Sequence, residues 1–116
     1  MIYERFVQAI QSDEGFRSTP YYDTADPPVP TIGYGTTAYY PGDPVKINDP
    51  AITEGVAQQL MQSDLFTALG DAQAIFSTFQ HMNDTRQEVV CNMAYNLGKG
   101  RLLGFKNMIK ACDQMV

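Results

Sequence analysis

All seven prolines of this 116-residue chain lie between Pro20 and Pro50, and this clustering limits where regular helices can form. Proline fixes φ and has no amide proton to donate inside a helix or a central strand. The same segment is rich in Tyr, Thr and Asp, which favour turns and short strands. We therefore predict a small antiparallel sheet here, with strands near residues 21–24, 31–37 and 45–47 and an interrupting "ADPPVP" loop.

Helical periodicity occupies both flanks of the proline-rich segment. Apolar residues recur at i, i+3, i+4 and i+7 over residues 2–12, and Gly15 is a natural stop for that helix. After the prolines, Thr53 is a good N-cap for a long helix whose apolar stripe weakens at Gly70.

Two further helices are expected toward the C-terminus. "TRQE" at residues 85–88 has the form of a capping box, opening a helix that Gly98 closes. That helix would bury Val89, Val90, Met93, Ala94 and Leu97. A last helix would start near Gly104, with Phe105, Met108, Ile109 and Cys112 on one side.

These elements predict an α+β, mainly helical fold in a single domain of residues 1–116. Its first part would be a helix and a sheet over about 1–52, and its second a long helix and helical lobe over about 53–116.

Charge and hydropathy exclude several classes of function. The net charge is −5, from 13 acidic and 8 basic side chains with no Lys/Arg block, so the footprint of a nucleic-acid-binding protein is missing. The acidity also argues against simple charge attraction to anionic membranes or cell walls. No apolar run approaches the ~20 residues that span a bilayer, and the N-terminus does not resemble a signal peptide. We expect no stable membrane insertion and a cytoplasmic protein until something releases it.

The residues that commonly bind metals are sparse. Cys91 and Cys112 form no metal-like cluster, and reduced thiols are favoured over a disulfide. His81 is the only histidine, which leaves little basis for a zinc site or a Ser–His triad. We expect neither a metal nor a cofactor.

Two carboxylates flank the start of the proline-rich segment. Glu14 could simply be a solvated surface charge. It lies, however, at the C-terminal end of the first helix, where the negative end of the helix dipole and any burial raise the pKa of a carboxyl group. A carboxyl kept protonated in this way can act as a general acid. Asp23 would either cap the following turn or remain ionised and activate a water.

The strand after these carboxylates has an unusual face. In an extended strand Thr31, Gly33 and Gly35 share one face, a hydroxyl followed by two positions without side chains. Such a face would let a bulky substrate lie close to the backbone. Two carboxyl groups beside an open groove, one with a raised pKa and the other ionised, are typical of enzymes that cut glycosidic bonds.

With these residues laid out, the sequence resembles the phage-type lysozymes, or endolysins. The shared pattern is Glu14–Gly15, then Asp23, then "TIGYG" from Thr31. The resemblance continues in "ITEGVAQQLMQSD", similar to the family's interlobe helix, and in "RQEVVCNMAYNLGKGRLLGFKN". It implies a lysozyme-like two-lobe fold and hydrolysis of peptidoglycan between N-acetylmuramic acid and N-acetylglucosamine, for bacterial lysis.

Residue by residue, the resemblance implies that Glu14 protonates the leaving oxygen, Asp23 deprotonates the attacking water and Thr31 holds that water. The implied substrate-binding positions are Gly33, Tyr34, Asn96 and Phe105. The family commonly inverts the anomeric centre, which requires roughly 6.5–9.5 Å between the carboxyls, against roughly 5–5.5 Å for retention.

The sequence departs from the family pattern in three places. The loop between Asp23 and Thr31 is longer, and it either shifts Thr31 or bulges outward. Thr36 replaces the family's histidine, and we predict that it hydrogen-bonds Asp64 in place of the family's ion pair. The chain stops at Val116, so we expect either a truncated product or an unusually small C-terminal lobe, whose uncovered apolar surface would favour a partner or self-association.

Other functions remain open. A catalytically inactive lysozyme-like module could bind glycan or a protein partner, and an active enzyme could instead be a chitin-active hydrolase or a lytic transglycosylase. The expected partner in the main interpretation is the peptidoglycan polysaccharide, met by a free lysis enzyme or a virion component.

Overall fold

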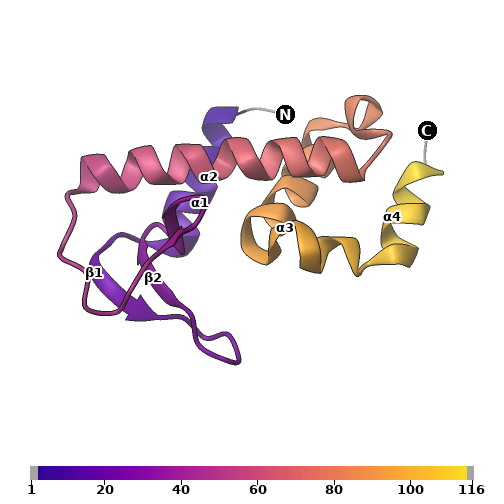
Figure 1. The fold of residues 1–116 in the computed structure, drawn as a ribbon. Helices are drawn as coiled ribbons and strands as arrows, with labels where there is room; N and C mark the ends of the chain where they lie inside the picture. Colours follow the sequence, from indigo (N-terminus) through magenta and orange to yellow (C-terminus); the bar gives the residue numbers. More distant parts are fainter. Residues whose placement is uncertain (1–2, 115–116) are drawn as a thin grey trace. The chain divides into compact units, whose positions relative to one another are not determined.

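The computed structural model describes residues 3–114, and its elements confirm the α+β, mainly helical fold class (Figure 1). In chain order the elements are α1 (Tyr3–Glu14), β1 (Arg17–Tyr22), β2 (Pro30–Gly33), β3 (Ala38–Tyr40), β4 (Asp43–Pro44), α2 (Glu54–Ile75), the short 3-10 helix η1 (Phe79–His81), α3 (Asp84–Leu103) and α4 (Lys106–Asp113). The strands all fall between α1 and α2, in the segment that contains the prolines.

The described chain divides into two compact units. Residues 8–64 form one, here called the sheet unit, and residues 3–7 with 65–114 form the other, here called the helical unit. The division falls inside α1 and α2, because each of these helices contributes to both units.

Two antiparallel pairs make up the strands of the sheet unit. β1 pairs with β2 so that Tyr21 lies opposite Thr31 and Tyr22 lies opposite Pro30, with an irregularity between Tyr21 and Arg17. β3 pairs with β4 in a short hairpin. The predicted strand at 45–47 is wrong, since β4 covers only Asp43–Pro44.

The predicted strand at 31–37 is wrong beyond Gly33, where the chain turns back on itself. Gly33 and Gly35 have φ of +65° and +88°, in the region that side-chain-bearing residues rarely adopt. Ile32 and Thr36 then exchange backbone hydrogen bonds of 2.9 Å in each direction. The alternation expected of a strand therefore stops at the first glycine.

The core of the sheet unit forms where this turn meets α2. Its buried apolar side chains include Ile10, Ile32, Val45, Ala57 and Met61. A Cβ placed on Gly33 would lie 3.1 Å from the Cβ of Ala57, closer than most Cβ contacts in folded proteins. Glycine at this position thus lets the turn approach the helix.

Of the two helix N-caps predicted from the sequence, the structure confirms one and contradicts the other. The Thr53 hydroxyl accepts a hydrogen bond from the Val56 amide at 3.2 Å, as predicted. The capping box at Thr85 is wrong, because Asn83 caps α3 by accepting from the Arg86 amide at 2.8 Å. The helix begins earlier than the box implied.

Inside the helical unit, the buried face of α3 differs in part from the prediction. Val90 and Ala94 are buried as expected, but Val89 is 54% exposed and Cys91 is fully buried instead. Gly98 leaves the helical conformation, with φ +75° and ψ 163°, which confirms the predicted interruption of the helix.

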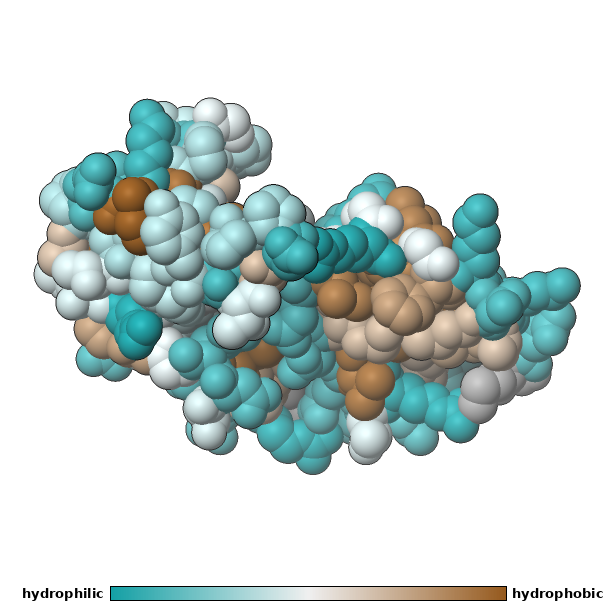
Figure 2. Space-filling model, turned by 90° about the horizontal axis from the view of Figure 1, so that it is seen from below, coloured by the Kyte–Doolittle hydropathy of each residue, from teal (hydrophilic) through white to brown (hydrophobic). Residues whose placement is uncertain are grey.

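The last helix is poorly covered. α4 buries none of its residues, and Phe105 before it is 47% exposed. Apolar (brown) surface is visible over the helical unit in Figure 2. A cavity of about 340 Å³ opens beside η1, α3 and α4; its lining includes Met82, Val90, Met93, Met108 and Cys112.

Candidate active site

Glu14 is the last residue of α1, at the point where the chain leaves the helix for β1. Gly15 ends the helix with φ +65° while its amide donates to the Gln11 carbonyl at 3.0 Å. The Glu14 side chain is half-buried against Gly35, where an added Cβ would lie 3.2 Å from Oε2 of the carboxyl. The glycine turn after β2 therefore forms part of the wall around this carboxyl.

The surroundings of Glu14 favour its protonated form. Burial is the main cause that raises the pKa of Glu14, and the adjacent charge of Asp13 raises it further. Within residues 3–114 no donor hydrogen-bonds the carboxyl, so nothing there stabilises its charged form. The raised pKa expected from the sequence is confirmed in direction.

Asp23 caps the turn that follows it. Its Oδ1 accepts hydrogen bonds from the amides of Ala25 at 3.0 Å and Val29 at 2.8 Å. Its own amide donates to the Val29 carbonyl at 3.1 Å, which closes the loop of residues 24–28 at its base. One carboxylate oxygen is thus held by the backbone, and Oδ2 takes no part in these bonds.

Thr31 is anchored to the Val29 carbonyl, which also accepts from the Asp23 amide. Its hydroxyl donates to the Val29 carbonyl at 2.9 Å, so this carbonyl accepts from both Thr31 and Asp23. Because the loop of residues 24–28 closes at the pairing of Asp23 with Val29, Thr31 is anchored next to its base.

Gly33 and Tyr34 are packed rather than open. Gly33 is buried against Ala57, and Tyr34 is 5% exposed with its hydroxyl donating to Glu54 Oε1 at 2.9 Å. The Phe16 ring lies 5.8 Å from the Tyr34 ring. The expectation of an open strand face is wrong at Gly33, because the turn directs this residue toward Ala57 of α2.

The predicted bond between Thr36 and Asp64 is confirmed. The buried Thr36 hydroxyl donates to Asp64 Oδ2 at 2.9 Å. Burial raises the pKa of Asp64 to about 6, and the Thr36 hydrogen bond opposes this rise. The pair joins the glycine turn to the middle of α2 within the sheet unit.

Asn96 and Phe105 belong to the helical unit, whereas the other predicted site residues lie in the sheet unit. Asn96 is exposed on α3 and its amide nitrogen donates to the Asn92 carbonyl at 3.0 Å and to the Asn92 side chain. Phe105 is exposed ahead of α4.

Sequence reasoning missed Arg17 and Tyr21 on β1. The Arg17 guanidinium lies 4.4 Å from the centre of the Tyr21 ring. Burial raises the pKa of Tyr21 most, the charges of Glu14 and Asp23 also raise it, and the charge of Arg17 lowers it. Their position in the sequence between Glu14 and Asp23 could have identified them. A short strand that links two site residues places the side chains of one of its faces near the same site.

Within residues 3–114, no cluster of three or more His, Cys, Asp or Glu side chains could hold a metal ion. The described helices include none with the length and apolarity needed to span a bilayer.

Comparison with known proteins bears on the family and the fold of the chain. Residues 11–114 match the sequence model of the family described as phage lysozyme. Among solved structures, the fold is similar to an endolysin from Escherichia coli O157:H7 phage FAHEc1, with a TM-score of 0.76 and 24% sequence identity. That match covers 97% of this chain and 67% of the endolysin chain. No curated protein matches the sequence. The lysozyme-like fold is confirmed, and the chain belongs to the phage lysozymes, a family of peptidoglycan hydrolases.

Proposed function

We propose that this protein is an N-acetylmuramidase that hydrolyses the β-1,4 bond between N-acetylmuramic acid and N-acetylglucosamine in peptidoglycan. Glu14 is the general acid, Asp23 the general base, and Thr31 the second group that holds the attacking water. The observation that carries the proposal is the state of the Glu14 carboxyl, which is half-buried, lacks a hydrogen-bond donor among residues 3–114 and has a raised pKa.

Glu14 meets the requirements of a proton donor to a sugar oxygen. A glycosidic oxygen is a poor leaving group until it is protonated, so the acid must still carry its proton near neutral pH. Burial and the charge of Asp13 both act in this direction. The absence of a side chain at Gly35 leaves room beside the carboxyl.

Asp23 and Thr31 meet the requirements of a water-binding pair. The Thr31 hydroxyl donates its hydrogen bond to the Val29 carbonyl, so toward a water its oxygen can act only as an acceptor. Asp23 uses Oδ1 for two backbone amides, which leaves Oδ2 to accept the second proton of that water. A water held through both protons would direct a lone pair toward the sugar.

Asn96 and Phe105 are proposed to contact the glycan. The Asn96 amide nitrogen is committed to Asn92, which leaves its side-chain oxygen to accept from a sugar hydroxyl. Phe105 offers an exposed ring on which an apolar sugar face can lie. Gly33 and Tyr34 would act indirectly, by forming the turn that places Gly35 beside Glu14.

The test uses purified protein on isolated bacterial cell walls. Wild-type protein should clear the suspension, and Glu14→Gln should lose about 10²–10⁴-fold in rate, the usual contribution of a general acid. Glu4→Gln is the matched control, because Glu4 is exposed on the same helix. Walls that stay intact with wild-type protein but bind it would instead support an inactive glycan-binding module.

Product analysis tests the bond and the stereochemistry. Borohydride reduction of a muramidase digest yields reduced muramic acid ends, whereas a lytic transglycosylase leaves anhydro ends. We propose inversion, so proton NMR during the first turnovers should detect the α-anomer before mutarotation. An initial β-anomer would contradict the water-activating role of Asp23. As a lysis enzyme, the protein would remain in the host cytoplasm until it reaches the cell wall.

A further inference from the structure

We propose that the hydroxyl of Tyr21 donates a hydrogen bond to the glycan bound between Glu14 and Asp23, and that Arg17 holds the Tyr21 ring in place for this contact. The inference rests on the proposed function, because it assigns a further substrate-binding residue to the same site. Three features of the sheet unit support it: the position of Tyr21 on β1, the contact with Arg17, and a hydroxyl that has no hydrogen-bond partner among residues 3–114.

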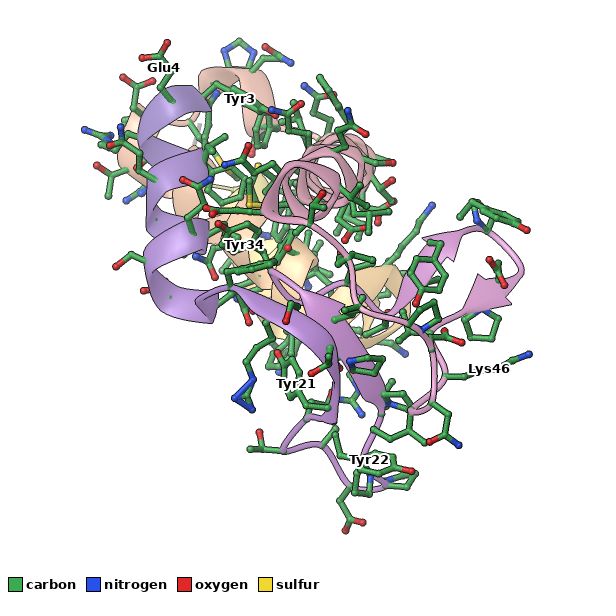
Figure 3. All side chains as sticks on the ribbon, turned by 90° about the vertical axis from the view of Figure 1, so that its left-hand side faces the viewer. Tyr3, Glu4, Tyr21, Tyr22, Tyr34 and Lys46 are labelled. Carbon is green, nitrogen blue, oxygen red and sulfur yellow. The ribbon has the colours of Figure 1, made fainter. Side chains whose placement is uncertain are left out.

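Tyr21 lies on the strand that joins the two carboxylates. It is paired across the sheet with Thr31, the proposed water-binding residue. Tyr22 follows it along β1 toward the hairpin loop, and successive residues of a strand face opposite sides (Figure 3). Tyr21 is half-buried while Tyr22 is 57% exposed. Only the first of these two tyrosines therefore faces the candidate site.

The Tyr21 phenol lies within electrostatic reach of both candidate catalytic acids. The charges of Glu14 and Asp23 each raise the pKa of Tyr21, after the larger effect of burial. A phenol with a raised pKa keeps its proton throughout the neutral range and remains a hydrogen-bond donor. Sugar hydroxyl, ring and N-acetyl oxygens can all accept such a bond.

The Tyr21 hydroxyl has no acceptor within the described chain. Tyr34 donates to Glu54 and Tyr39 donates to Asp49, each at 2.9 Å. Tyr21 makes no such bond with another of residues 3–114. Tyrosine hydroxyls usually find a partner when they are buried. This half-buried donor is thus left for water or for a ligand.

Arg17 fixes the ring from which the hydroxyl projects. A guanidinium 4.4 Å from the ring centre is at the distance of a cation–π contact. The strand irregularity between Arg17 and Tyr21 places these two side chains together. Holding the ring in advance reduces the side-chain entropy that is lost when substrate binds.

The experiment compares Tyr21→Phe with Tyr22→Phe, using soluble uncross-linked glycan strands as the substrate. Tyr21→Phe removes the hydroxyl and keeps the ring, so we expect kcat/KM to fall about fivefold, the effect of one neutral hydrogen bond. Tyr22→Phe should leave kcat/KM unchanged. Both variants should melt at the wild-type temperature, because neither hydroxyl bonds to the described protein.

Binding gives a readout that does not depend on turnover. In the Glu14→Gln background, adding Tyr21→Phe should weaken binding of the same glycan strands about fivefold, and Arg17→Gln should weaken it in the same direction. Unchanged binding and kcat/KM in Tyr21→Phe would overturn the inference while leaving the muramidase proposal standing. A lowered melting temperature for Tyr21→Phe would also overturn it, since it would reveal a structural bond. A wild-type protein without activity would instead refute the proposed function.

Discussion

Replacing Asp64 with Asn should stabilise the protein at neutral pH. Asp64 is a half-buried carboxylate on α2 that accepts a hydrogen bond from Thr36. Burial raises its pKa from 3.8 to about 6. An asparagine removes the desolvated charge, while its side-chain oxygen can still accept from the Thr36 hydroxyl. The variant therefore separates the cost of the charge from the benefit of the hydrogen bond.

The size of the effect follows from the pKa shift. A shift of about two units corresponds to about 3 kcal/mol, at ~1.4 kcal/mol per unit. Solvent reaches part of this carboxyl and screens its charge, so we expect a gain of about 1–2 kcal/mol for Asp64→Asn above pH ~7. The pKa of the folded state lies above that of the unfolded state. The stability contributed by protonated Asp64 is therefore complete below pH ~4 and is lost as pH rises through about 6.

The measurement is urea unfolding followed by far-ultraviolet circular dichroism, from about pH 4 to about pH 8. The advantage of Asp64→Asn over wild type should be largest at the alkaline end and shrink on acidification. Asp71→Asn serves as the control, since this carboxylate lies on the same helix and makes no hydrogen bond with the described residues. An advantage that is absent at pH ~8, or that does not depend on pH, would refute the reasoning.

A companion variant tests the hydrogen bond itself. Thr36→Val removes the donor and leaves Asp64 without it, so we expect a loss of about 1–3 kcal/mol at neutral pH. In the Asp64→Asn background this loss should be smaller, because an unpaired amide costs less to bury than an unpaired carboxylate. Equal losses in both backgrounds would show that the charge of Asp64 does not contribute to the coupling.

Three further predictions concern the candidate site and the helix caps. Gly35→Ala and Gly42→Ala each introduce a side chain at φ +88°, so each should lower the free energy of unfolding by about 1–3 kcal/mol. Only the methyl group at position 35 would meet Glu14, so only Gly35→Ala should also reduce the rate of cell-wall clearance. Asp13→Asn removes a charge that raises the pKa of Glu14, so the alkaline limb of the profile of kcat/KM against pH should move to lower pH; an unmoved limb would exclude Asp13 as a contributor. Asn83→Ala removes the cap of α3 and should lower the free energy of unfolding in urea by about 1 kcal/mol, whereas Thr85→Ala should lower it by less. A larger loss for Thr85→Ala would support the predicted capping box instead.

Features that depend on neighbouring residues in the chain were predicted well from the sequence. The prolines confined the strands to the segment between α1 and α2, and Gly15 marked the end of α1 beside Glu14. Thr53 was identified as a cap because its hydroxyl bonds an amide only three residues away. The bond between Thr36 and Asp64 was predicted from the family pattern, which already encodes a contact between two distant segments.

The tertiary structure decided the features that depend on what a side chain packs against. The "TIGYG" segment fits an extended strand by its pattern, but contact with Ala57 and Glu14 makes Gly33 and Gly35 a turn. Val89 is exposed although it was expected on the buried face of α3, because the periodicity of a helix defines a face only to within about one residue. Tyr21 gained its proposed role because its ring contacts Arg17 and the charges of Glu14 and Asp23 raise its pKa. The sequence alone thus determined the order of helices and strands and those ends that neighbouring residues fix, such as the end of α1 at Gly15 and the start of α2 after Thr53. The contacts between them, which are made by residues far apart in the chain, determined which groups meet at the candidate site.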